Sequence, residues 1–278
     1  MTTQKSITRA SALKFTNDFP GLSGVNIMAH HYPIEPFLVF TEFKMTQPVF
    51  GPHPHAGVSV MTYMLPDSEN SFINRDSLGD QSIIEPGGLH ITQAGSGMFH
   101  DEFPLVPGAV AHGFQIWINH SEQHRFVTPT SFHANVNDIP EVATQDYTVR
   151  VLHGKFGNQE AKHRMVTDVT LLHIFLHPNA SIQLDASEMA FVYGLNGSGV
   201  AEMESIGAQR LLHYSAAGNS IAIKSGGSGL EFMFGSGSPL NEQITYGGPF
   251  VTTTPEQMEE VKRRHASGMM GTLAPYRR

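Results

Sequence analysis

The strongest chemical signal in the sequence comes from two short motifs that carry histidine and glutamate. His53 and His55 lie two residues apart in the segment GPHPHAG, and His100 and Glu102 lie two residues apart in MFHDEFP. Residues at positions i and i+2 of a β-strand point to the same face. If the two strands are neighbours in one barrel, three imidazoles and one carboxylate converge.

This donor set has the chemistry of a divalent metal site. Three neutral imidazoles with a carboxylate suit Fe(II), Mn(II), Ni(II) or Cu(II), and they leave one or two positions for water, oxygen or a substrate. The same set can hold Zn(II). The chain has no cysteine, so no thiolate is available to select among these metals. The four residues are therefore candidate metal ligands.

Other histidines among the 16 in the chain compete with this interpretation. His120, Glu122 and His124 also alternate, but they lie in the polar segment NHSEQHR and are interpreted as a solvated turn. His90 could face the same barrel interior, where we expect a hydrogen-bonded core histidine. Asp80 is expected in a loop, without an acid–base role.

The C-terminal half also contains histidines, but their spacing does not predict a metal site. None forms a His-x-His pair, and none has an acidic residue two positions later. His173 and His177 share a strand face, but they lie roughly 13 Å apart along an extended strand, too far for one ion. We therefore predict one metal per chain and a structural second half. The histidines concerned are His153, His163, His173, His177 and His213.

The elements that must position these residues are predicted to be strands. Short apolar runs rich in Val, Ile, Thr and aromatic residues alternate with turns that contain Gly and Pro. Many short strands with regular turns are typical of barrels and sandwiches, so we predict an all-β fold with two barrel-like domains. We expect strands at residues 36–43, 57–65, 88–95, 113–119, 147–154, 168–177, 189–197, 210–215, 219–225 and 230–237.

The order of these runs also predicts the domain organisation. The polar stretch 129–145 is expected to join the two halves. We predict an N-terminal domain with the metal site at residues 1–135 and a C-terminal domain without metal at 146–237. A final segment at 238–278 is expected to pack back on the barrels.

One helix is predicted within that final segment. Thr254 has the residue type of an N-cap, Pro255 suits the first helical position, and Gln257 completes a capping box. The basic run from Lys262 favours the negative end of the helix dipole, and Gly268 is expected to end the helix.

Composition excludes several classes of function. The net charge is −8 with 17 Lys and Arg, which argues against direct binding of nucleic acid. No apolar run approaches the roughly 18 residues of a membrane span, and the N-terminus lacks an apolar signal core. The absence of cysteine excludes a disulfide framework. We expect a cytoplasmic protein that does not contact membranes.

Two longer segments resemble the pirin family of the cupin superfamily. They are FGPHPHAGVSVMTYML and RDSLGDQSIIEPGGLHITQAGSGMFHDEFP, and the ending GSPLNEQITYGGPFVTTTPEQ is also similar. The resemblance covers the N-terminal half closely and most of the chain loosely. It implies a bicupin with a metal in the first barrel only, bound by His53, His55, His100 and Glu102, with Fe(II) as the first choice.

The resemblance also implies two functions of different kinds. Some pirin-like proteins cleave the flavonol quercetin with dioxygen, which implies a small aromatic enol substrate and a catalytic role for Glu102 as ligand and base. The mammalian relative is an iron-dependent transcriptional co-regulator, which implies instead a non-catalytic, redox-sensing protein with a protein partner. A third reading is an isomerase or lyase that uses the metal only as a Lewis acid.

The chain departs from the usual family pattern around the four ligands. His-Arg-Gly-Phe-Glu is replaced after the first pair by a segment with Ala56, Val58 and Ser59. Gly-Asp-Leu-Gln-Trp-Met is replaced by a segment with His90 and Ile91. Groups around a metal ligand tune the affinity for the metal and the acidity of bound water, so these positions bear on substrate and rate.

Overall fold

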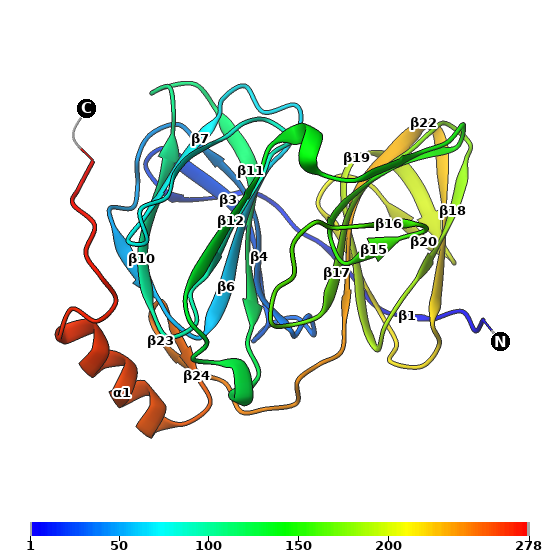
Figure 1. Cartoon of the computed structure of the whole chain (residues 1–278). Coiled ribbons are helices and arrows are strands. Elements are labelled where there is room, and N and C mark those ends of the chain that lie inside the picture. The colour runs from blue at the N-terminus through cyan, green and yellow to red at the C-terminus, as the bar shows by residue number, and fades with distance from the viewer. Residues whose placement is uncertain (1, 277–278) are drawn as a thin grey trace.

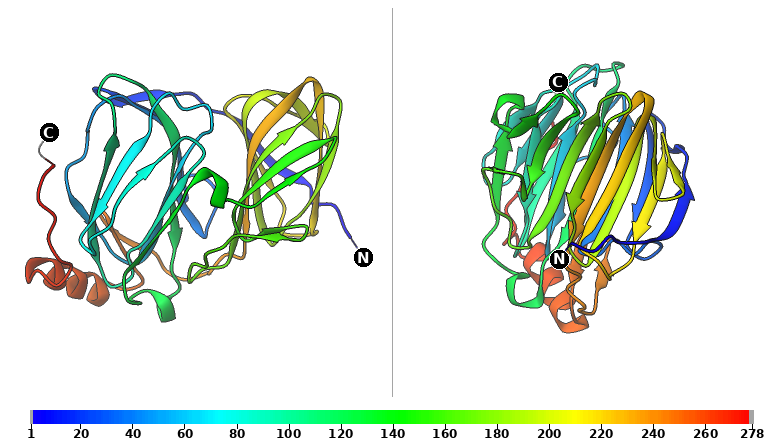
Figure 2. Two further views of the ribbon diagram at one scale, coloured as in Figure 1. Left: turned by 45° about the horizontal axis from the view of Figure 1, so that its top comes forward. Right: turned by 90° about the vertical axis from the view of Figure 1, so that its right-hand side faces the viewer.

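The computed structural model describes residues 2–276 and consists of two β-barrels that lie side by side (Figure 1). The predicted all-β class is confirmed, with one α-helix near the C-terminus. Two further views show that this helix lies against the N-terminal barrel, away from the C-terminal barrel (Figure 2).

The N-terminal barrel is built from two antiparallel sheets. The outer sheet has four strands in the order β5 (His53–His55), β10 (Met98–Pro104), β7 (Phe72–Asp76) and β8 (Gln81–Ile84). The other sheet faces the C-terminal barrel and has seven strands, in the order β12 (Thr130–Ala134), β9 (Leu89–Gln93), β6 (Val58–Met64), β11 (Ala111–Asn119), β4 (Phe37–Met45), β3 (Leu22–Met28) and β2 (Thr16–Phe19).

The C-terminal barrel is formed by one continuous nine-stranded sheet. Its main path runs through β1 (Ile7–Ala12), β21 (Arg210–Tyr214), β19 (Met189–Ala201), β22 (Ser220–Gly237), β17 (Val169–Leu176), β14 (Tyr147–His153) and β13 (Glu141–Ala143). Two more strands, β18 (Ser181–Asp185) and β20 (Glu204–Ile206), pair with β22 and β19. The first strand of the chain thus completes the C-terminal sheet, although it lies inside the range 1–135 expected for the N-terminal domain.

Short elements connect the barrels and decorate their ends. The stretch 129–145 gives β12 to one barrel and β13 to the other. The remaining elements are β15 (Lys155–Phe156), β16 (Gln159–Glu160), β23 (Thr245–Gly247), β24 (Phe250–Thr252), the 3₁₀ turns η1 (Glu122–His124) and η2 (Val136–Asp138), and α1 (Pro255–Ala266). Within residues 2–276, no helix has the length and apolar character that crossing a membrane requires.

The largest apolar core lies between the barrels rather than inside either one. Alternate residues of β6 divide between two environments: Met61 and Tyr63 face the neighbouring barrel, while Thr62 faces the interior of its own. Phe191 and Tyr193 of β19 face Met61 and Tyr63 in the same core. Because both faces of these sheets are buried, their strands are nearly continuously apolar.

A chain of hydrogen bonds also crosses between the barrels. The Arg150 guanidinium donates to the Tyr63 hydroxyl (2.8 Å), which donates to Nδ1 of His173 (2.8 Å). Nε2 of His173 then donates to the Glu231 carboxylate (3.0 Å). These groups are satisfied inside an apolar core, where unpaired polar groups are costly.

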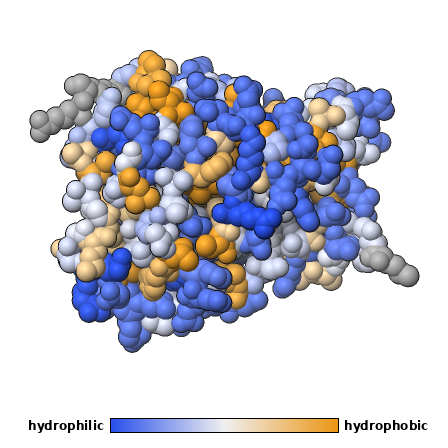
Figure 3. All heavy atoms as spheres, viewed as in Figure 1, coloured by the Kyte–Doolittle hydropathy of each residue, from blue (hydrophilic) through white to orange (hydrophobic). Residues whose placement is uncertain are grey.

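The predicted C-terminal helix is confirmed together with its cap. Thr254 accepts a hydrogen bond from the backbone N–H of Gln257, and the Gln257 side-chain oxygen accepts one from the backbone N–H of Thr254. Met258 and Val261 are the buried residues of α1, and they pack with Ala56 and Phe250 against the N-terminal barrel. The visible face of the molecule is mainly hydrophilic, with hydrophobic residues gathered mostly over this barrel (Figure 3).

Candidate metal centre

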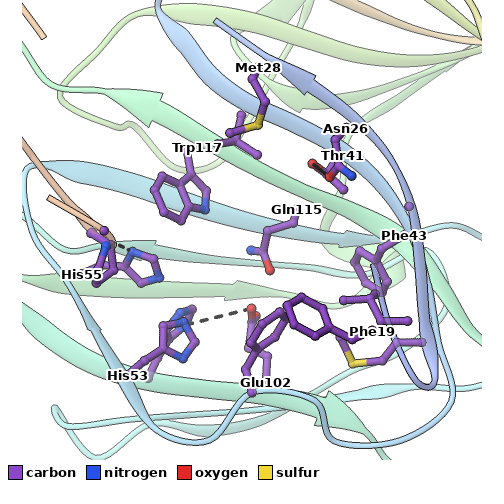
Figure 4. Close-up of a pocket in the computed structure, with 18 of the residues that line it drawn as sticks. Phe19, Asn26, Met28, Thr41, Phe43, His53, His55, Glu102, Gln115 and Trp117 are labelled. Carbon is purple, nitrogen blue, oxygen red and sulfur yellow. Dashed lines mark hydrogen bonds and ion pairs between the residues drawn. The ribbon is translucent and has the colours of Figure 1, made fainter. Parts of the chain in front are cut away.

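The two predicted motifs meet on neighbouring strands of the N-terminal barrel. β5 and β10 pair antiparallel, and the register places His53 directly opposite His100. The ring centroids of His53, His55 and His100 form a nearly equilateral triangle with sides of 4.7, 4.9 and 4.9 Å. Each ring offers a nitrogen that lies within 4.8 Å of the other two. Figure 4 shows His53, His55 and Glu102 close together at one end of a pocket.

Two of the three imidazoles are oriented by backbone carbonyls. Nδ1 of His53 lies 2.9 Å from the carbonyl oxygen of Gly51, and Nδ1 of His55 lies 3.2 Å from that of Pro249. A carbonyl can only accept, so each Nδ1 carries the hydrogen and each Nε2 keeps its lone pair. Metal-binding histidines in proteins are commonly held in this way. The donor set therefore fits a divalent metal.

Burial keeps the deeper histidines neutral, as metal ligands must be. Loss of hydration lowers the pKa of His55 to about 3, with a further contribution from the nearby His53. The same cause, followed by the proximity of His55 and His53, holds the pKa of His100 well below its ordinary value. Neutral imidazoles repel a cation less than imidazolium does and have a free lone pair.

Glu102 lies beside the three histidines and not inside their triangle. Its Oε2 is 4.0 Å from Nδ1 of His100, and it accepts hydrogen bonds from Thr62 and Gln115. Gln115 also donates to the Thr62 hydroxyl at 3.0 Å, which fixes both donors. Burial raises the pKa of Glu102 to about 7, against the opposing effect of those hydrogen bonds. The carboxyl group is thus placed to exchange a proton near neutral pH.

A cavity of about 520 Å³ opens in front of these four side chains. Its size falls within the range of sites for small organic molecules, roughly 300–1,000 Å³. Trp117 packs edge-on against His55 with a centroid distance of 4.8 Å. The apolar side chains of the cavity wall are Phe19, Leu22, Met28, Val39, Phe43, Met45, Phe50, Phe72, Trp117, Tyr246 and Pro249.

The wall residues were not predicted from the sequence. They come from β2, β3, β4, the segment before β5, β7, β11 and the C-terminal segment, so they are brought together by the pairing of distant strands. Alternation contributes within β4, which presents Val39, Phe43 and Met45 to the cavity. The C-terminal contribution is the least expected: Tyr246 lines the cavity, and Pro249 holds His55. Gly57 allows this close approach, since a Cβ there would lie 1.9 Å from the carbonyl oxygen of Val251, and its φ of +78° favours glycine.

The competing histidines have different surroundings. His120 is fully buried, with Nε2 2.9 Å from the Ser59 hydroxyl, so the solvated turn expected there is wrong for this residue. Burial, followed by the nearby charge of Arg125, lowers the pKa of His120 to about 3. Nδ1 of His124 lies 3.0 Å from the Ser121 hydroxyl. His90 is buried as expected, but its ring nitrogens have no hydrogen-bond partner among the described residues.

The described histidines of the C-terminal half form no group of three, although the rings of His153 and His163 lie 5.2 Å apart. His173 and His213 face the core between the barrels, where His213 stacks on Tyr32. His153 uses both ring nitrogens on backbone groups of Val169 and Met165. Within residues 2–276, the groups of three metal-competent side chains all lie in the N-terminal barrel.

Comparison with known proteins gives matches to both halves. The family model "Pirin" matches residues 22–118, and the model "Pirin C-terminal cupin domain" matches residues 171–271. A pirin-like protein of Arabidopsis thaliana is 31% identical over 245 residues, which cover 81% of this chain and 76% of the relative.

Solved structures share the whole architecture. A quercetin 2,3-dioxygenase from Acinetobacter baumannii superposes with a TM-score of 0.87 at 20% identity, covering 98% of this chain and 100% of that one. A bacterial pirin from Escherichia coli, in complex with nickel(II), gives a TM-score of 0.66 at 20% identity, covering 83% and 100%. At this level of identity, the likeness establishes the bicupin fold.

Proposed function

The chain belongs to the pirin family of the cupin superfamily, and we propose that it is a metal-dependent dioxygenase resembling quercetin 2,3-dioxygenase. The substrates would be a flavonol-like enol and dioxygen. The observation that supports this proposal best is that three converging histidines line a largely apolar cavity of about 520 Å³. A site that only stored or sensed a metal would not need such a cavity.

In this proposal His53, His55 and His100 hold one divalent metal through their free ring nitrogens, with Glu102 as the fourth ligand. Fe(II) is our first choice, and Mn(II), Ni(II), Cu(II) and Zn(II) fit the same donors. When bound, such a metal supplies Lewis acidity toward an enol oxygen and, for the redox-active ions, reactivity toward dioxygen.

The protein's own residues bind and orient the substrate. The aromatic and aliphatic wall of the cavity removes water from a planar substrate and favours stacking on rings such as Trp117 and Phe43. Glu102 faces the same cavity, where its carboxylate can take the proton of the enol hydroxyl. Thr62 and Gln115 hold the carboxylate in place for this step.

An oxygen-uptake assay tests the proposal. Metal-free protein is loaded anaerobically with each of the five metals, and oxygen consumption is then followed with quercetin and related flavonols. We expect consumption to match loss of the flavonol absorbance, and His55→Ala to abolish it. If a loaded chain binds its metal but consumes no oxygen with any flavonol, the non-catalytic redox-sensing regulator becomes the better interpretation. The cytoplasmic location stays a proposal that rests on the absence of cysteine.

A further inference from the structure

A second cluster of metal-competent side chains lies inside the N-terminal barrel, next to the first. Asp76 ends β7, Asp80 follows in the turn before β8, and His90 lies on β9. Each offers a ligand atom within 4.8 Å of the other two. None of the three lines the large cavity, so this cluster is separate from the substrate pocket.

His90 provides an independent sign that a ligand is required here. Its side chain is 1% exposed, and neither ring nitrogen has a hydrogen-bond partner among the described residues. Nδ1 lies 3.9 Å from Oδ2 of Asp80, beyond hydrogen-bond distance but suited to two ligands of one ion. A buried polar atom without a partner costs about 1–3 kcal/mol.

Two buried oxygen atoms of Asp76 and Asn74 also lack a hydrogen-bond partner among the described residues. Oδ1 of Asp76 accepts hydrogen bonds from the backbone N–H groups of Leu78 (2.8 Å) and Asp80 (3.0 Å), which fixes the carboxylate. Its other oxygen, Oδ2, is buried and has no partner within the described part of the chain. The same holds for Oδ1 of Asn74, whose amide nitrogen donates to Asp80 at 2.9 Å.

His213 shows what an unpartnered histidine looks like without a cation site. Both of its ring nitrogens are also buried and lack a partner in the described chain, but it stacks on Tyr32 at 5.7 Å. The nearest charge that acts on it is the positive Arg9, which would repel a metal ion. His90 instead has two carboxylates beside it. The difference in charge separates a packing role from a binding role.

We propose that Asp76, Asp80 and His90 bind a second divalent cation, with the Asn74 amide oxygen as a further ligand. Two carboxylates, an amide oxygen and one imidazole favour Mn(II), Fe(II) or Zn(II) over softer ions. The ion would give these unpartnered buried atoms a ligand contact, and it would link the β7–β8 turn to β9. Asp80 remains about one quarter exposed, which gives the ion a route of entry.

This second site would also support the first one. Asp76 is the strand partner of His100 in the β7–β10 ladder, so the two clusters share a wall. The proposal does not depend on the dioxygenase function, and it raises the number of ions above the one per chain expected from the sequence.

Metal stoichiometry with variants of each cluster tests this proposal. Metal-free protein is saturated with Mn(II), freed of excess ion and analysed for manganese per chain. We expect two equivalents in the wild type and one in His90→Gln or Asp80→Asn. His53→Ala should also retain one, and the equivalent that each variant keeps shows that its barrel has folded. The matched control is His133→Gln, which alters the histidine next to His90 on β12 and should keep two.

Anomalous diffraction at the manganese edge locates the ions in the wild-type chain and does not rely on any variant. Peaks at both clusters would support the proposal. A single peak at the three histidines, or two equivalents retained by His90→Gln, would overturn it.

Discussion

The two barrels are built from similar strands but differ in what fills them. The interior of the C-terminal barrel is packed with Val, Leu, Ile and Phe side chains such as Leu184, Val192 and Phe232. The interior of the N-terminal barrel contains the buried polar residues Glu102 and Asn74 and opens into the large cavity. Side chains fill the interior of the C-terminal barrel, whereas within residues 2–276 the groups of three metal-competent side chains lie in the N-terminal barrel.

Histidine placement follows the same division. In the N-terminal barrel, strand pairing turns three imidazoles toward one point in the interior. In the C-terminal barrel, His173 and His213 point outward into the core between the barrels, where hydrogen bonding or stacking occupies them. The abundance of a residue type therefore says little about a site until the face of the strand is known.

Metal affinity tests the difference between the two barrels most directly. His53→Ala removes one candidate ligand, and the loss of metal affinity at the triangle should exceed the 10- to 100-fold typical of removing an outer hydrogen-bond partner. His177→Ala is a matched control in the C-terminal barrel, because His177 also anchors Nδ1 on a backbone carbonyl at 2.9 Å. Isothermal titration with Ni(II) measures both. Equal affinities in the two variants would remove His53 from the site.

Replacing one glutamate in each barrel is expected to give the next largest difference, measured as turnover. Glu102→Gln keeps the shape of the side chain but loses its charge and basicity, so the proposed dioxygenase activity of the metal-reconstituted protein should fall about 100-fold or more. Glu231→Gln changes a glutamate that also lies beside a buried histidine, but in the other barrel, and should leave turnover near the wild-type value. Steady-state oxygen uptake at matched metal content compares them. Full turnover by Glu102→Gln would exclude the base role.

The contact between the barrels is expected to depend on Tyr63. Tyr63→Phe leaves the Arg150 donor and Nδ1 of His173 without their partner, which should cost about 1–3 kcal/mol of unfolding free energy. Tyr32→Phe serves as the control, since no hydrogen bond of its hydroxyl is found in residues 2–276, and its effect should stay within about 0.5 kcal/mol. Denaturant unfolding compares the two. Equal stabilities would mean that the relay between barrels contributes nothing.

The last prediction concerns the unfolding free energy in acid, and the expected effect vanishes at neutral pH. Burial, and then the positive Arg9, lower the pKa of His213 to about 4, whereas an unfolded histidine titrates near 6.5. Between these values the unfolded chain binds the extra proton, so unfolding becomes easier as pH falls below about 6.5. His213→Phe removes this group and keeps its ring. At pH 5 the variant should lose about 2 kcal/mol less than the wild type, relative to pH 7.

Acid and denaturant unfolding at pH 5 and pH 7 measure that difference in metal-free protein. An identical pH dependence of the two proteins would show that His213 takes up its proton without opposing the fold.

The sequence was sufficient for the fold class and for the four residues that now face one cavity. Spacing at i and i+2 has a direct geometric meaning in a strand, so His53, His55, His100 and Glu102 could be assigned to common faces before their strands were known to pair. The capping residues of α1 act locally in the same way. In both cases the structure is determined by geometry or contacts among residues only a few positions apart in the sequence.

Features that depend on distant pairing could not be found in this way. The segment of β1 carries only weak alternation, and its place in the C-terminal sheet depends on pairing with β21, about 200 residues away. Asp80 and His90 look unrelated in the sequence because a turn and a strand separate them. Their proximity, and the lack of partners at His90, become visible only when the barrel is closed.

The hydrogen bond between Pro249 and His55 has a consequence for how the protein is made. The histidine triangle is encoded before residue 101, but the carbonyl that orients His55 comes from a segment synthesised almost at the end of the chain. The backbone of Val251, from the same late segment, packs directly against Gly57. On the ribosome, the centre therefore stays incomplete until the C-terminal segment emerges and docks. A prematurely terminated chain would contain all four candidate ligands without the group that orients one of them.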